Sequence, residues 1–424
     1  MLKAINIFAV AVAAALLGTA LRADFTLFDM AKDSMYITKG EFTGLQRTGV
    51  GDRLTLRCDT MIKGALPVGT EVTLEAFEPA PADAALGRDV IVGFNLINGK
   101  HYFLHHPFAQ RGAFYFETDD TAPNGLEQTE RALRNLLVIN EPRLPLIVAE
   151  LQKRLQYEDA GYEGSFPADL IQAWRSELIL QASWKNTWAA RDAAKALVDH
   201  KLFKGTCSVE EICVIGALVA NSEVGSITRA YMLELIRTEA SAHPSMNVLV
   251  GMVREETSQA CVGKLSNLLK VCEDRPAVLA AMGELISNSN SSVQMRCNGL
   301  QILQALRDVN GLAHVHAAIR AEMARGADNS KPVLRRAFDA MRSTPDTSNA
   351  KVIEDFQATD ICTASWEMTQ YSWVAYAMID TTGSNVKIAQ MFTSEKNEAR
   401  RNFFNKLMPQ NKVYRELLII HPES

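Results

Sequence analysis

Hydrophobic and polar residues alternate along the first part of the chain, from Asp33 to about Thr118. The clearest case is the segment 53–58, where every second residue is apolar, as in a strand with one buried face. The predicted strands are 35–38, 41–43, 53–58, 70–75, 90–97, 100–104 and 113–117. About six short strands in this length are typical of a small antiparallel β-barrel or sandwich.

Turn-forming residues separate these strands. Gly40 and Gly44 are expected at bulges or turns, and Asn98-Gly99 is a hairpin signal. The segment 63–69 is predicted to be a connector, and the Pro- and Ala-rich segment 79–87 is predicted to be a loop.

From Gly125 onward the apolar residues recur at helical spacing, as they do in the segment 293–303. Ser208 and Glu211 form a capping box, in which each side chain binds an amide of the first helical turn. The predicted helices are 125–139, 143–157, 167–182, 186–201, 208–220, 226–240, 244–255, 258–272, 275–288, 291–308, 311–325 and 331–342. Many short helices with one apolar stripe each predict an α-solenoid, with an irregular helical bundle as the alternative.

Similar phrases recur within the helical part. The segments 293–300 and 333–340 lie about 40 residues apart, and 227–234 echoes them. This spacing fits helical repeats of roughly 40 to 47 residues. The three segments resemble the second helix of HEAT- or armadillo-type repeats.

The β-rich part also resembles a known kind of domain. It carries Gly-x-Phe at 40–42, the pattern L-x-L-x-C-x-x-x-I-K-G-x-L-P-x-G-x-x-V-x-L over 54–74, and Tyr-Phe-Leu at 102–104. This is similar to the OB-like small β-barrel of secreted bacterial proteins of unassigned role, over about a quarter of the chain. The resemblance implies a barrel that packs or binds, and it implies no catalytic residue.

The first 23 residues have the three parts of a secretory signal peptide. Lys3 is basic, an apolar run follows over 5–17, and small residues precede the expected cleavage after Ala23 or Ala20. The apolar run is shorter than the roughly 20 residues of a membrane-spanning helix. An uncleaved signal anchor and a buried N-terminal helix are the alternatives. The sequence therefore predicts an exported chain, periplasmic or extracellular, with no stable membrane span after cleavage.

The C-terminal part begins with a linker at 343–349. An aromatic helix at 366–378 and a helix at 395–407 follow, and an apolar strip lies at 413–420. We expect the aromatic helix to cap the solenoid.

Composition narrows the class of protein. The chain has 424 residues, 47% of them hydrophobic, and a formal net charge of −5, which argue for a folded protein and against a dedicated nucleic-acid binder. Seven cysteines without a C-x-x-C pair argue against a disulfide scaffold, although Cys207 and Cys213 remain a conceivable pair.

Histidines offer two places to look for a metal. His101, His105 and His106 follow one another on a predicted strand, where His101 and His105 share a face but lie about 13 Å apart. His314 and His316 point to different sides of a helix. Ordinary core or surface histidines explain both groups better than a metal site.

Charged clusters are also explained by structure. The carboxylate pairs are adjacent residues that suit capping and solvation, at 119–120, 210–211 and 255–256. The basic patch of Lys396, Arg400, Arg401 and Lys406 is interleaved with Phe403 and Phe404, and reads as an amphipathic helix. No catalytic, cofactor-binding or metal-binding residue is assigned, and no cofactor.

The sequence thus predicts an α+β protein of four parts: a signal peptide (1–23), a β-barrel (24–120), a helical-repeat domain (121–342), and a C-terminal linker with capping helices (343–424). We expect an exported, non-enzymatic interaction or scaffold protein with a protein partner and no nucleic acid. The alternative is an exported hydrolase, possibly metal-dependent, at the barrel–helical junction. His101, His105, His106, Asp119 and Asp120 are its candidate residues.

Overall fold

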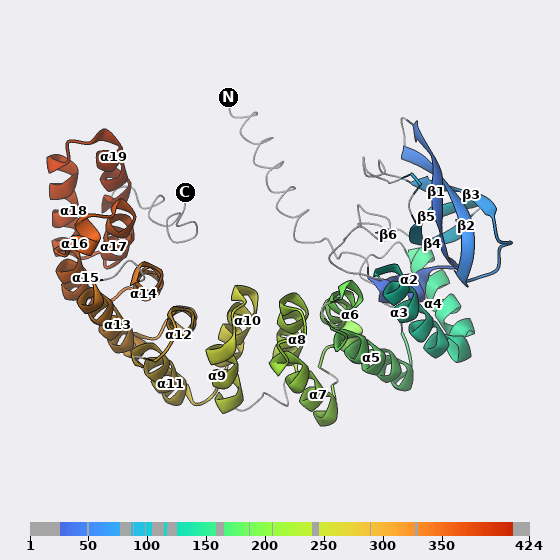
Figure 1. Ribbon diagram of the computed structural model, residues 1–424, viewed down its shortest axis with the longest axis horizontal. Helices are drawn as coiled ribbons and strands as arrows, with labels where there is room; N and C mark the ends of the chain where they lie inside the picture. The colour runs from blue at the N-terminus through green and yellow to red at the C-terminus, as the bar shows by residue number, and fades with distance from the viewer. Residues whose placement is uncertain are drawn as a thin grey trace. The chain divides into compact units, whose positions relative to one another are not determined.

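The computed structural model describes residues 26–48, 51–76, 86–87, 89–97, 99–103, 114–116, 125–157, 165–185, 187–205, 207–239, 246–288, 290–326 and 330–409. The chain divides into two compact units, residues 1–242 and 243–424. The first unit contains a β-sheet and helices α2 to α8, and the second contains helices α9 to α19 (Figure 1). This arrangement confirms the predicted α+β fold class, with a sheet first and helices after it.

The described strands are β1 (Tyr36–Thr48), β2 (Gly51–Lys63), β3 (Thr70–Ala76), β4 (Asp89–Ile97), β5 (Lys100–Phe103) and β6 (Phe114–Phe116). Their order in the sheet is β1-β2-β3-β5-β4-β6, and β1 also pairs with β4. The first five strands therefore form a closed circuit, which is a small barrel.

One pairing of the barrel is parallel rather than antiparallel. β3 pairs with β5 in parallel, whereas the other pairs are antiparallel. The topology requires this: β3 runs in the same direction as β1, β4 runs against β1, and β5 runs against β4. The sheet is therefore mixed, which the pattern within single strands could not reveal.

The barrel core follows from the alternation of residues along its strands. On β2, Leu54, Leu56 and Cys58 are buried, while Arg53 and Arg57 point outward and form ion pairs with acidic side chains of neighbouring strands. The buried core residues are Phe42, Leu54, Leu56, Cys58, Val72, Leu74, Val90, Val92 and Phe94. One face of each strand is thus apolar because it lines the interior.

Gly40 and Gly44 lie at irregularities of the β1–β2 pairing, as the sequence predicted. The register shifts between Lys39 and Gly40 and again between Phe42 and Gly44. At Gly40 a Cβ atom would lie 2.0 Å from the main-chain oxygen of Arg57. The bulge brings the two backbones closer than any side chain allows.

We expect Gly40→Ala to destabilise the first unit by about 3 kcal/mol, because neither backbone can move away without breaking the ladder. Urea unfolding at equilibrium measures this change. Gly216→Ala is the control, since a Cβ there meets nothing within 4 Å in the middle of a helix. That control should be neutral or slightly stabilising. Equal effects of the two substitutions would contradict the close approach at Gly40.

The helices of the first unit are α2 (Leu27–Asp33), α3 (Gly125–Asn140), α4 (Leu144–Tyr157), α5 (Ala168–Ala182), α6 (Trp188–Asp199), α7 (Val209–Ala220) and α8 (Ser226–Thr238). Short 3-10 turns lie at Glu141–Arg143 and Lys201–Phe203. Helix α5 packs on α6, and α8 packs on both α6 and α7. Helix α3 contacts the sheet through β2 and β4, and it also packs on α5 and α6.

The helices of the second unit are α9 (Met246–Glu255), α10 (Gln259–Lys270), α11 (Arg275–Ser287), α12 (Val293–Leu306), α13 (Leu312–Arg325), α14 (Lys331–Ser343), α15 (Asn349–Gln357), α16 (Asp360–Thr363), α17 (Trp366–Met378), α18 (Thr382–Ser394) and α19 (Glu398–Leu407). A 3-10 turn at Val309–Gly311 precedes α13. The first helices of successive pairs, α9, α11, α13 and α15, pack on one another in that order and form the first-helix layer. The second helices, α10, α12, α14 and α17, do the same and form the second-helix layer (Figure 1).

This layered stacking supports the prediction of a helical-repeat architecture. The repeated phrases at 293–300 and 333–340 fall on α12 and α14, which are neighbours in the second-helix layer. The phrase at 227–234 falls on α8, the second helix of the α7–α8 pair.

The sequence analysis missed several helices. It did not predict α2, α15, α16 or α18, each of which is short or begins with turn-forming residues. The aromatic helix was predicted with the bounds of α17, and α15 and α17 each pack on the preceding helix of their layer. The signal segment 1–23 and the apolar strip 413–420 lie outside the described residues.

Candidate functional site: a buried polar network around helix α2

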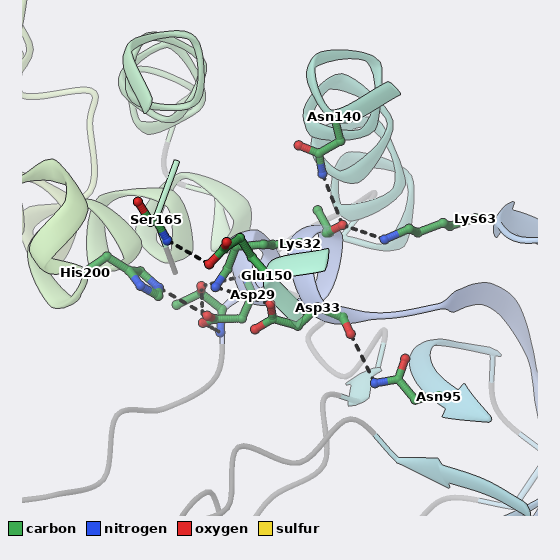
Figure 2. A network of polar contacts seen from close by, with 11 residues as sticks. Asp29, Lys32, Asp33, Lys63, Asn95, Asn140, Glu150, Ser165 and His200 are labelled. Atoms are coloured by element: carbon green, nitrogen blue, oxygen red, sulfur yellow. Dashed lines mark hydrogen bonds and ion pairs between the residues drawn. The ribbon is translucent and has the colours of Figure 1, made fainter. Parts of the chain in front are cut away.

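Helix α2 is the centre of a network of buried polar contacts in the first unit (Figure 2). All seven of its residues are buried, and the helix packs against α3 and α6. It begins with a capping box, in which Thr26 and Asp29 satisfy each other's backbone amides. A helix this short has few internal hydrogen bonds, so its stability depends on its surroundings.

Asp29 is the hub of the network. Its Oδ2 accepts hydrogen bonds from the Thr26 amide at 3.0 Å and from the Thr26 hydroxyl at 2.8 Å. Its Oδ1 lies 3.2 Å from Nε2 of His200, at the C-terminal end of α6. Burial by itself raises the pKa of Asp29, but His200, Lys32 and the Thr26 hydroxyl outweigh it and hold the pKa well below the ordinary range. The carboxylate is therefore charged.

Asp192, on α6, is a second buried carboxylate, and its pKa is shifted in the opposite direction to that of Asp29. Its Oδ2 accepts the Leu27 amide at 2.7 Å. Burial raises the pKa of Asp192 to about 7, and the nearby charge of Asp29 adds to the rise while Lys195 and Arg191 oppose it. Two carboxylates in one buried region cannot both ionise cheaply, so their pKa values are pushed apart.

The barrel binds the C-terminal end of α2 through main-chain oxygens. Lys63 Nζ of β2 donates to the Ala31 oxygen at 2.9 Å, and Asn140 Nδ2 of α3 donates to the same oxygen at 3.2 Å. Asn95 Nδ2 of β4 donates to the Asp33 oxygen at 3.1 Å. Burial lowers the pKa of Lys63 to about 8, although Asp33 opposes part of that shift. These three side chains satisfy carbonyls that the short helix leaves free.

The remaining charges of the network are also paired. Lys32 lies 3.2 Å from Asp33, and Glu150 of α4 accepts the Ser165 amide at 3.0 Å (Figure 2). Lys153 lies 2.5 Å from Glu150. The network therefore joins α2 to the barrel, α3 and α6 through side chains that bind main-chain groups.

A carboxylate beside a histidine is half of a hydrolytic constellation, so Asp29 and His200 need to be tested for that role. The His200 ring lies between aromatic neighbours, with Phe28 at 5.0 Å and Phe203 at 6.0 Å between ring centroids. Of the two Asp29 carboxylate oxygens, Oδ2 binds the cap of its own helix and Oδ1 faces His200. These contacts are those of an anchor that holds α2.

The sequence analysis did not single out Asp29, Asp192, His200 or Lys63. Two signals could have found them. Thr26-x-x-Asp29 is a capping sequence, and Asp192 lies on the buried alanine-rich side of α6. A charged residue on an apolar stripe indicates a paired or neutral buried group.

The histidine group at the predicted barrel–helical junction is described only in part. His101 lies on β5, and its ring packs edge-on to Phe94 at 5.5 Å and to Tyr36 at 6.2 Å. Burial lowers the pKa of His101. His105, His106, Asp119 and Asp120 lie outside the described residues, so a site at the junction stays a prediction.

His314 and His316 pack against different helices. His316 Nε2 lies 2.7 Å from Asn349 Oδ1 at the start of α15. The His314 ring covers Gly283 of α11, where a Cβ would lie 2.3 Å from it. Across the described ranges, no group of three or more His, Cys, Asp or Glu residues is placed to hold a metal ion.

The charged clusters have structural partners. Glu211 completes the predicted capping box with Ser208 and pairs with Arg175 at 2.9 Å. Glu256 accepts the amides of Thr257 and Ser258 at 3.0 and 2.8 Å. Glu210 is exposed, as is Glu255, and the pair at 119–120 is not described.

Most of the predicted basic patch lies on α19, where Arg400 contacts a cluster of aromatic rings. The Arg400 guanidinium lies 4.8 Å from the ring centroid of Trp366. Phe404 is fully buried and packs edge-on to Trp373 at 5.3 Å, while Phe403 packs on Trp366 at 5.4 Å. Both phenylalanine rings therefore pack within the fold.

Cys207 and Cys213 do not form a disulfide. Within the described part of the chain, no helix is long and apolar enough to cross a membrane. Neither a protein-family model, nor a curated protein, nor a solved structure matches this chain.

Proposed function

We propose that this chain is an exported, non-enzymatic protein that binds or organises a protein partner on its helical repeats. The supporting observation is the pair of stacked layers in the second unit, in which successive second helices lie side by side. Stacked repeats offer long surfaces of exposed side chains that suit extended partners. The polar network around α2 is consistent with this role, because its side chains bind main-chain groups of α2.

The finer assignments belong to the same proposal. The strand order β1-β2-β3-β5-β4 with closure onto β1 supports an OB-like barrel, and the paired helices support HEAT- or armadillo-type repeats. Export rests on the signal-like first 23 residues. The proposed parts are a signal peptide (1–23), a barrel (24–120), repeats (121–342) and capping helices (343–424).

The experiment is capture of a partner by the tagged full chain from the envelope fraction of the source organism, followed by mass measurement of the purified complex. We expect one protein retained at a fixed stoichiometry through gel filtration. N-terminal sequencing of the exported chain is run alongside, and a terminus after Ala20 or Ala23 supports export. Absence of a stoichiometric partner, together with metal in the purified protein and hydrolysis that His101→Ala abolishes, would replace this proposal with the hydrolase.

A further inference from the structure

The two layers of the second unit differ in charge. The helices of the second-helix layer carry Lys264, Lys270, Arg296, Lys331, Arg335, Arg336 and Arg342 against Asp339 and Glu367. The helices of the first-helix layer carry Arg254, Arg275, Arg320, Arg325 and Lys351 against Glu255, Glu284, Glu322, Glu354 and Asp355. One layer is therefore strongly basic, while the other is balanced.

Part of this positive charge is neutralised inside the fold. Arg296 is buried and pairs with Glu322 of α13, and Arg342 is buried 2.9 Å from Asp339. The first pair joins α12 to α13, and the second lies within α14. The charge that a partner meets comes chiefly from Arg335, Arg336 and Lys270.

The accessible charge centres on two adjacent arginines of α14. The Arg335 side chain is 41% exposed and pairs with Glu367 of α17, at 2.6 Å. Arg336 is half-buried and donates to the neutral Oε1 of Gln259, on α10, at 3.1 Å. Lys264 and Lys270 on α10 add further charge, and Lys270 is exposed. Arg336 of α14 thus reaches α10, and its hydrogen-bond acceptor there is an uncharged amide rather than a carboxylate.

Amide side chains accompany the basic ones. Gln259 and Asn267 of α10 are exposed, and Gln301 and Gln304 of α12 and Gln370 of α17 are half-buried. Helices α10 and α12 contain no carboxylate. An amide both donates and accepts, as a peptide main chain requires, while a guanidinium binds a carboxylate with two parallel hydrogen bonds.

We propose that the second-helix layer binds an extended acidic segment of the partner protein. Arg335 and Arg336 bind its carboxylates, and the amides of α10, α12 and α17 bind its main chain. Helices α10, α12 and α14 hold one aromatic ring, the buried Phe338, so within this layer nucleic-acid bases would find part-exposed rings only on α17. This inference rests on the proposed function and names the chemistry of its partner.

The test is fluorescence anisotropy of the full chain with a labelled peptide of alternating Glu and Ser. The same peptide with Gln in place of Glu is the uncharged comparison. We expect the acidic peptide to bind at least about tenfold more tightly, with affinity falling as salt rises. Equal affinity for the two peptides would overturn the inference.

Matched variants locate the site. Arg335→Gln with Arg336→Gln should weaken binding of the acidic peptide by about tenfold or more, because hydrogen bonds to charged groups are lost. Arg254→Gln with Arg320→Gln removes the same charge from exposed positions of the first-helix layer and should change affinity by less than about twofold. Arg336→Gln alone is the second variant, since it leaves the Arg335–Glu367 ion pair in place. An equal loss in both double variants would place the binding elsewhere.

Two further comparisons complete the test: the binding of other ligands, and capture of the partner by the double variant. Tighter binding of single-stranded DNA or of anionic lipid vesicles than of the acidic peptide would overturn the peptide assignment. If the double variant at 335 and 336 still captures the stoichiometric partner, this inference fails while the proposed function stands. If the wild-type chain captures no partner but binds the acidic peptide, the proposed function fails on its own test.

Discussion

Phe28→Ala is expected to destabilise the first unit by about 3 to 5 kcal/mol. Phe28 is 1% exposed, and its ring packs edge-on to Trp174 and Phe203 at 5.2 Å and to His200 at 5.0 Å. Truncation leaves a cavity among three rings that secondary structure holds in place, so the site cannot collapse to fill it. It also removes the aromatic side chain by which α2 packs on its neighbours. The polar network binds main-chain groups at the ends of the same helix.

Hydrogen exchange of α2 and α5 peptides during a urea titration measures this change for the first unit alone. Met35→Ala is the matched control, since Met35 lies just after α2 and is 47% exposed. Its cost should stay below about 1 kcal/mol. If Phe28→Ala cost no more than the control, α2 would not be anchored as described. The exchange of α12 and α14 in the second unit should not change.

The sequence predicted most elements because their patterns are local. Residues 226–238 and 366–378 are helices within two residues of the predicted bounds, since each is a run of helix-compatible residues without glycine or proline. The alternation of apolar and polar residues at 53–58 likewise predicted part of β2, which covers Gly51–Lys63. The bulge at Gly40 was predicted because glycine inside a strand indicates a close backbone approach.

The features that the sequence missed depend on contacts far along the chain. Helix α2 is seven residues long and buried on every side, so it has no amphipathic stripe to recognise. Its partners Asp192 and His200 come more than 160 positions later. The parallel β3–β5 pair likewise arises from closure of the barrel and not from either strand's pattern.

The charge asymmetry of the second unit was hidden for the same reason. Over the whole chain the acidic and basic residues nearly cancel, and the sequence analysis treated the helical part as unremarkable in charge. Only the alternation of first and second helices sorts the basic residues into one layer. The arginines of α14 and the lysines of α10 are about 65 to 75 positions apart, yet α12 alone separates their helices in the stack.

Asp192→Asn is expected to stabilise the first unit at pH 8, by on the order of 4 kcal/mol. In the folded chain the pKa of Asp192 is raised to about 7, so the folded state holds a proton that the unfolded chain releases near pH 4. Stability contributed by this group is therefore full below about pH 4, falls as the pH rises to about 7, and stays low above that. An asparagine oxygen still accepts the Leu27 amide at the position of Asp192 Oδ2, but it has no charge to bury.

Comparison of the variant with the wild type across pH isolates this effect from that of Asp29. The lowered pKa of Asp29 acts in the opposite sense, since its stabilisation is present above about pH 4 and is lost in acid. Urea midpoints of the two chains should agree near pH 4 and separate steadily up to pH 7. Asp169→Asn is the control, because that side chain is 63% exposed and an exposed carboxylate contributes little to stability. A variant less stable than wild type at pH 8 would show instead that Lys195 and Arg191 stabilise a charged Asp192, and that the two carboxylates around α2 both ionise.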